Sequence, residues 1–71
     1  MTDQHRDMVS PPQRLSRTRY EQYLGKLRGE GWAWGDAFGT GLEALLVHGD
    51  LEIQVVRVSP QRWEVSCWKQ S

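Results

Sequence analysis

The chain has one cysteine, Cys67, no asparagine and no long apolar run. A single thiol excludes an internal disulfide and any zinc site that needs two cysteine ligands. No stretch approaches the roughly 18 apolar residues of a membrane helix, and the first residues lack the apolar segment of a signal peptide. We therefore expect a cytoplasmic protein that is neither exported nor inserted into a membrane.

Size and charge bound the possible functions further. The chain has 71 residues, with nine basic and nine acidic side chains and a formal net charge of zero. A chain this short forms one small domain and buries only about 60% of its unfolded surface, which leaves little scaffold for an enclosed active site. We expect no enzyme activity. Arginine outnumbers lysine seven to two, a bias that we interpret as a sign of bacterial or phage origin.

The few residues that could carry chemistry do not form a recognisable set. His5 lies in the first segment and His48 beside a predicted turn, too few ligands for a metal site. Cys67 alternates with Trp63 and Val65, which predicts a buried, inert thiol. Three glycines lack the spacing of a phosphate-binding loop and are expected to form turns: Gly35, Gly39 and Gly41. The sequence therefore predicts no catalytic residue, no cofactor and no metal.

The first half of the chain predicts an arm followed by a helix. Residues 1–15 are mostly polar and contain Pro11-Pro12, which disfavours both a helix and a central strand. We predict a mobile arm there and a single domain over residues 16–71. Ser16 is a plausible N-cap for a helix over residues 17–28, and Gly29 or Gly31 can end it. Its apolar face consists of Tyr20, Tyr23, Leu24 and Leu27.

The second half predicts a small antiparallel sheet. Strands are expected over residues 42–47, 51–58 and 63–68, with residues 32–34 as a fourth. The first turn is Gly49-Asp50, and the second lies at residues 59–62, where Pro60 takes the second position of a type I turn. The predicted fold is α+β: one amphipathic helix, first in the chain, packed on a three- or four-stranded sheet.

Regular pairing from these turns makes both faces of the sheet apolar. The first turn places Leu46 opposite Ile53 on one side, and the second places Val58 opposite Trp63 on the other. One side then carries Leu42, Ala44, Leu46, Leu51, Ile53, Val55 and Trp68. The other carries Leu45, Val47, Val56, Val58, Trp63, Val65 and Cys67.

One helix covers one face, so a second apolar face requires another explanation. Either another chain or the segment of residues 32–38 covers it, or a β-bulge at Val55-Val56 shifts the register and gathers both sets into one core. The regular register also predicts a cross-strand ion pair between Arg57 and Glu64. The sequence leaves the choice between the two registers open.

The leading functional hypothesis is a small non-enzymatic protein-binding module or regulator that acts through an apolar, Trp-bearing sheet face, alone or as a homodimer. Its expected contact residues are Trp34, Trp68, Val56 and Arg57. The alternative is nucleic-acid binding, because the charge is polarised. Six basic and three acidic residues precede Gly29 (6 − 3 = +3), and three basic and six acidic residues follow it (3 − 6 = −3). The expected contact residues of this alternative are Arg14, Arg17, Arg19 and Arg28.

Overall fold

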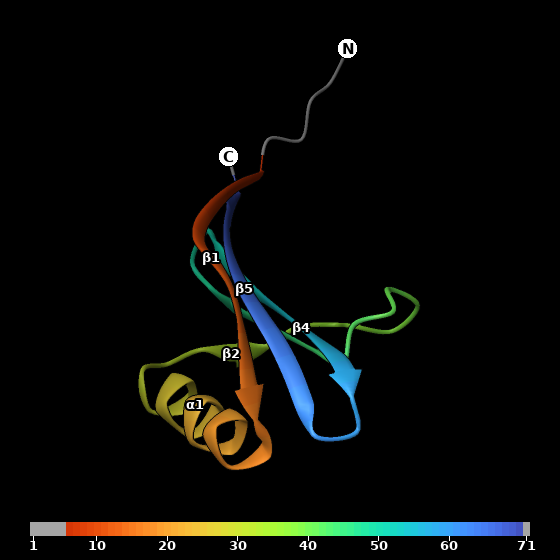
Figure 1. Cartoon of the computed structure of the whole chain (residues 1–71). Coiled ribbons are helices and arrows are strands. Elements are labelled where there is room, and N and C mark those ends of the chain that lie inside the picture. Colours follow the sequence, from red (N-terminus) through yellow and green to blue (C-terminus); the bar gives the residue numbers. More distant parts are fainter. Residues whose placement is uncertain (1–5, 71) are drawn as a thin grey trace.

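The computed structural model describes residues 6–70 and shows an α+β fold, as predicted. Residues 1–5 of the predicted arm, with His5, lie outside the described residues. The elements are β1 (Arg6–Ser16), α1 (Arg17–Gly29), β2 (Ala33–Trp34), β3 (Ala44–His48), β4 (Leu51–Ser59) and β5 (Arg62–Gln70). The strands form one antiparallel sheet in the order β1-β5-β4-β3-β2, and α1 packs beside it (Figure 1).

Helix α1 forms where the apolar period predicted it. The Ser16 hydroxyl accepts a hydrogen bond from the backbone N–H of Arg19 at 3.5 Å and so caps the first turn. Gly31 has a φ of 93° just beyond the last turn, and the N–H of Trp32 donates to the carbonyl of Leu27 at 3.1 Å. This pattern is a Schellman motif, which needs glycine at the left-handed position. Both ends of the helix are therefore set by local sequence.

Strand β1 corrects the predicted order of elements, because a strand and not the helix comes first. It pairs with β5 at the edge of the sheet. The pairing shifts between Ser10 and Gln13, where Pro11 and Pro12 stand opposite a single residue of β5. Proline has no N–H to donate, so strands accept it at edges and bulges. Both conditions hold here, and the sheet gains a fifth strand that the sequence pattern did not indicate.

The first hairpin has the predicted register. Ala44 pairs with Val55, Leu46 with Ile53 and His48 with Leu51 across the turn. Gly49 has a φ of 62°, which a two-residue hairpin turn requires. The short strand β2 adds to the edge of β3 and confirms the predicted fourth strand.

The second hairpin departs from regular pairing and decides between the two registers in favour of a bulge. Ser59 pairs with Arg62 and Arg57 with Trp63, so Val58 is an extra residue without a partner in β5. The bulge shifts the pairing of β5 with β4 by one residue, so each β5 side chain lies on the face opposite to the one expected from regular pairing. The bulge was expected at Val55-Val56, and the structure places it at Val58. It still shifts the register of β5 as a bulge is expected to do.

The bulge moves Trp63 and Val65 of the second predicted face into the core under α1, whereas Leu45, Val47 and Val56 stay on the far side of the sheet. Trp63 and Val65 now share a side with the inward residues of β3 and β4. Trp63 stacks on Tyr20 of α1, with ring centroids 5.0 Å apart and planes 8° from parallel. The buried core consists of Leu27, Ala44, Leu46, Ile53, Val55, Trp63 and Val65.

The opposite face of the sheet has a polar centre. Glu52 is buried there, and its carboxylate accepts hydrogen bonds from the side-chain amides of Gln54 and Gln70, each at 2.6 Å. Trp68 stands opposite Glu52, and its indole N–H donates to the hydroxyl of Ser66 at 2.9 Å. Buried polar groups need such partners to offset their lost hydration. This face is therefore not the continuous apolar surface expected from the regular register.

Candidate functional site

The four residues expected to bind a protein partner do not form one surface. Trp34 lies opposite Leu46 on the helix side of the sheet, with the guanidinium of Arg28 5.7 Å from its ring centre. Arg57 also lies on the helix side, opposite Trp63. Val56 and Trp68 lie on the other side. The predicted set falls into two pairs, because Val56 and Arg57 are neighbours in β4 and face opposite sides, and the bulge at Val58 places Trp68 on the side of Val56.

The predicted ion pair between Arg57 and Glu64 is wrong for the same reason. Arg57 lies over the indole of Trp63, 5.6 Å from the ring centre, and donates to the carbonyl of Pro60 at 3.2 Å. Glu64 instead pairs with Arg14 of β1, with 3.3 Å between Nε and Oε2. Both contacts depend on the observed pairing of β5 with its two neighbours.

Basic side chains gather where β1 ends and α1 begins. A hollow of about 520 Å³ is lined by three arginines with no acidic residue among the lining side chains: Gln13, Arg14, Leu15, Ser16, Arg19 and Arg62. We call this the arginine hollow. Ser16 pairs with Arg62 across the β1–β5 ladder, which brings the second hairpin turn to the start of the helix. Within residues 6–70, neither Arg19 nor Arg62 has an ion-pair partner.

The amino end of α1 adds to this positive potential. A helix carries partial positive charge at its amino end, and acidic residues in the first turn usually offset that charge. The first turn of α1 has no acidic residue and contains Arg17 and Arg19 instead. Arginine side chains are repelled by the positive amino end of the helix, whereas an anion bound there would be attracted both to that end and to the arginines. The amino end of α1 therefore carries cations where acidic residues are usual.

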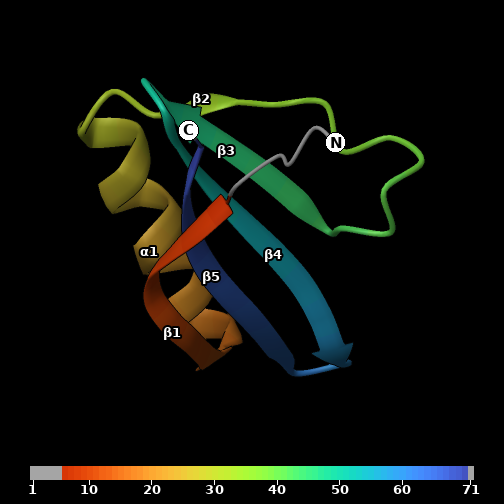
Figure 2. The same cartoon turned by 90° about the horizontal axis from the view of Figure 1, so that it is seen from above.

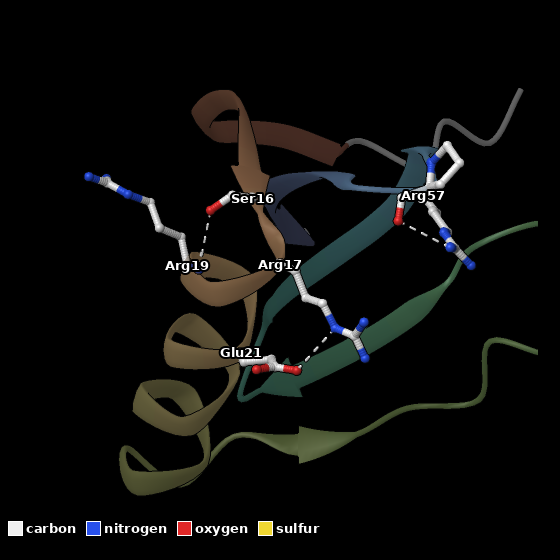
Figure 3. A network of polar contacts seen from close by, with 6 residues as sticks. Ser16, Arg17, Arg19, Glu21 and Arg57 are labelled. Carbon is white, nitrogen blue, oxygen red and sulfur yellow. Dashed lines mark hydrogen bonds and ion pairs between the residues drawn. The ribbon is translucent and has the colours of Figure 1, made fainter.

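A second concavity adjoins the arginine hollow on the other side of α1. It lies between the helix and the second hairpin turn, has a volume of about 460 Å³, and contains Arg17 and Arg57 together with Glu21 and Glu43. Arg17 pairs with Glu21 at 3.5 Å. Figure 3 shows Arg17 and Arg57 on this side of the helix and Arg19 pointing away from it. Charges are balanced in this groove, whereas they are not in the arginine hollow.

The structure regroups the basic residues that the sequence suggested. Arg14 and Arg19 line the arginine hollow, Arg17 lies in the adjoining groove, and Arg28 lies at the other end of α1 against Trp34. Arg62 was missed because it was assigned only to a turn. No sequence signal connects it with Arg14, because their proximity depends on the pairing of β1 with β5.

The other candidate groups are arranged as packing residues. His48 packs against Trp32, with ring centroids 5.3 Å apart. Cys67 is half-buried next to the core, and burial raises the pKa of its thiol above the ordinary value of 9.0. Among the described residues, no three His, Cys, Asp or Glu side chains are placed to hold a metal ion. Residues 6–70 also contain no helix that is long and apolar enough to cross a membrane.

We expect the stability of the fold to decrease at alkaline pH. Burial raises the pKa of Tyr20 and Tyr23 above 10.0, with smaller contributions from the charge of Glu43 at Tyr20 and from Cys67 and Glu30 at Tyr23. The unfolded chain therefore releases these protons at a lower pH than the folded chain, which makes the free energy of unfolding fall as pH rises. Urea unfolding should show little change from these groups below about pH 9 and a decline above about pH 10.

The Tyr23→Phe variant is the matched control, because it removes one of the two phenols and keeps the ring. Its decline in unfolding free energy above about pH 10 should be shallower than that of the unchanged protein. Stability that rises between pH 9 and 11 would contradict the assigned direction of the shifts.

Comparison of the chain with protein-family models, with curated proteins and with solved structures gave no match.

Proposed function

We propose that the protein is a non-catalytic binding module that holds the phosphate backbone of a nucleic acid in the arginine hollow. The observation that carries this proposal is the convergence of Arg14, Arg19 and Arg62 around one concavity without a lining acidic residue. The amino end of α1 supports it, since helix amino ends favour anions. The leading sequence hypothesis used an apolar sheet face, and the face that carries Val56 and Trp68 is interrupted by buried Glu52 and its two amide partners.

Phosphate is the anion that these side chains suit best. A guanidinium presents a planar fork of donors that can bind two phosphate oxygens at once, and it stays charged at all physiological pH values. The arginine hollow offers Arg14, Arg19 and Arg62 as three cationic positions, and Arg19 and Arg62 have no acidic partner within residues 6–70. A chain of regularly spaced phosphates can occupy several such positions, whereas a single small anion cannot. An acidic protein segment is the competing partner, and the experiment below separates the two.

The test removes the two arginines that have no acidic partner. In the Arg19→Gln, Arg62→Gln double variant, we expect affinity for a fluorescently labelled single-stranded oligonucleotide to fall roughly 10- to 30-fold at about 0.1 M salt, because each lost phosphate contact removes its counterion-release contribution. Fluorescence anisotropy measures the change. For the unchanged protein, log K should fall with log salt with a slope of about −2 if three phosphates are contacted.

Two further variants serve as controls. One removes a positive charge outside the arginine hollow, and the other removes a negative charge next to it. Arg28→Gln removes one cation at the far end of α1 and should leave affinity within about twofold, since Arg28 is outside the hollow. Glu64→Gln releases Arg14 from its ion pair and removes a negative charge nearby, so affinity should increase several-fold. Binding that is insensitive to salt, or a polyglutamate peptide bound as tightly as the oligonucleotide, would overturn the nucleic-acid proposal.

A further inference from the structure

The loop between β2 and β3 presents an aromatic side chain to solvent. Phe38 is 94% exposed, the highest value among the large apolar side chains of the described residues. Complete exposure of a phenylalanine leaves its whole apolar surface in water, and burying such a surface against a partner is favourable. Large aromatic side chains also dominate the energetics of many protein interfaces. This position is the clearest unpartnered apolar group on the described surface.

The loop that carries Phe38 has a defined shape. The Asp36 carboxylate accepts a hydrogen bond from the N–H of Phe38 at 3.0 Å. Thr40 donates to the carbonyl of Ala37 through its hydroxyl at 2.6 Å and through its N–H at 3.2 Å. Two glycines follow with positive φ, Gly39 at 77° and Gly41 at 80°. A side chain held in this way loses less conformational entropy on binding than one on a loose loop.

Both ends of the loop are tied to the sheet. The N–H of Gly35 donates to the carbonyl of Leu45 at 2.8 Å, and the N–H of Glu43 donates to the carbonyl of Val55 at 2.7 Å. Residues 35–43 contain two acidic side chains, Asp36 and Glu43, and no basic one. Asp36 lies two residues before Phe38, whereas Glu43 lines the groove beside α1. The loop is therefore an anchored projection with an apolar tip and one adjacent carboxylate, which we call the Phe38 knob.

A hollow of complementary character lies on α1. Its volume is about 320 Å³, its lining is mostly apolar, and its polar rim is basic: Leu15, Arg19, Gln22, Tyr23 and Lys26. We call it the Tyr23 hollow. It contains two cationic side chains and no acidic one. An apolar floor with a basic rim matches an apolar tip beside the Asp36 carboxylate in both hydrophobicity and charge.

The knob and the hollow lie on opposite sides of one molecule. In both cartoon views the loop projects away from the sheet on the side opposite α1 (Figures 1 and 2). The knob of one copy therefore cannot enter its own hollow. We propose that the Phe38 knob of one copy docks in the Tyr23 hollow of a second copy, so that the protein associates head to tail. Such a contact joins two different surfaces and allows a chain of copies to grow. This proposal does not depend on the proposed function.

Mixing two variants tests this arrangement directly. Phe38→Ser removes the knob and keeps the hollow, and Lys26→Glu reverses a rim charge and keeps the knob. Sedimentation equilibrium of the unchanged protein should give a weight-average mass that rises above 8.2 kDa as concentration increases from ~10 µM to ~1 mM, since small interfaces bind weakly. Each variant alone should stay monomeric. An equimolar mixture should form a pair that stops at twice the monomer mass.

Controls separate docking from general stickiness and from misfolding. Val56→Ser removes another exposed apolar side chain, on the opposite sheet face, and should associate like the unchanged protein. Circular dichroism should show that each variant is folded, and Phe38→Ala provides a second variant of the knob. An unchanged protein that stays monomeric, a Phe38 variant that associates normally, a mixture without pairs, or growth that stops at a dimer would each overturn head-to-tail docking.

Discussion

Replacing Trp63 by alanine is expected to unfold most of the protein at 25 °C. Trp63 is 7% exposed, stacks on Tyr20 and carries the guanidinium of Arg57 on its ring. Truncation of a buried tryptophan costs about 3–5 kcal/mol. A chain of this size has a total stability of about 3–5 kcal/mol. The far-ultraviolet circular dichroism signal and its urea dependence should both show the loss of the folded state.

Trp63→Phe distinguishes the loss of packing from the loss of the indole N–H. The Nε1 of Trp63 is buried and has no hydrogen-bond partner within residues 6–70, and an unsatisfied buried donor costs about 1–3 kcal/mol. Phenylalanine removes that donor and keeps an aromatic ring beside Tyr20. We expect a loss of no more than about 1.5 kcal/mol. An alanine variant with an unchanged urea midpoint would show that Trp63 is not part of the core.

The second large loss of stability is expected from a lysine at Val55 but not at its neighbour Val56, because the two valines face opposite sides of β4. Val55 is completely buried between Ala44 of β3 and Val65 of β5. A lysine there would place a charge in the core without a partner, and its cost exceeds what so small a fold can tolerate. We expect Val55→Lys to be unfolded in water by circular dichroism and by loss of a cooperative urea transition.

Val56→Lys is the matched comparison. Val56 is 39% exposed and stands opposite Glu64, so a lysine at this position stays hydrated and faces an opposite charge. The expected change in unfolding free energy is within about 0.5 kcal/mol. The regular register would place Val56 in a second apolar face. Equal destabilisation by both substitutions would therefore support that register and contradict the bulge at Val58.

Local sequence was sufficient for α1 and the first hairpin. Ser16, the apolar period and Gly31 act within a few residues of each other, so the limits of the helix follow from short-range hydrogen bonds. The turn at Gly49-Asp50 likewise sets the pairing of β3 with β4. In both cases, the interactions that decide the structure connect residues close together in the chain.

The second hairpin and β1 could not be decided in this way. The turn residues permit either regular pairing or an extra residue in β4, and the choice depends on whether Trp63 can reach the core beneath Tyr20. Pro11-Pro12 disfavours a central strand, but an edge strand with a bulge accepts both residues. The free energy of burying distant side chains together determines these two features.

By itself, the sequence determined the class of fold, the helix with its two ends, the first hairpin and an excess of basic residues in the first half of the chain. Only the tertiary structure decided which apolar residues share a core and which arginines share a concavity. Arg62 joins Arg14 because β5 pairs with β1, and Trp63 joins Val55 because Val58 is an extra residue. Contacts between residues far apart in the chain depend on pairing and burial, which local propensities do not specify.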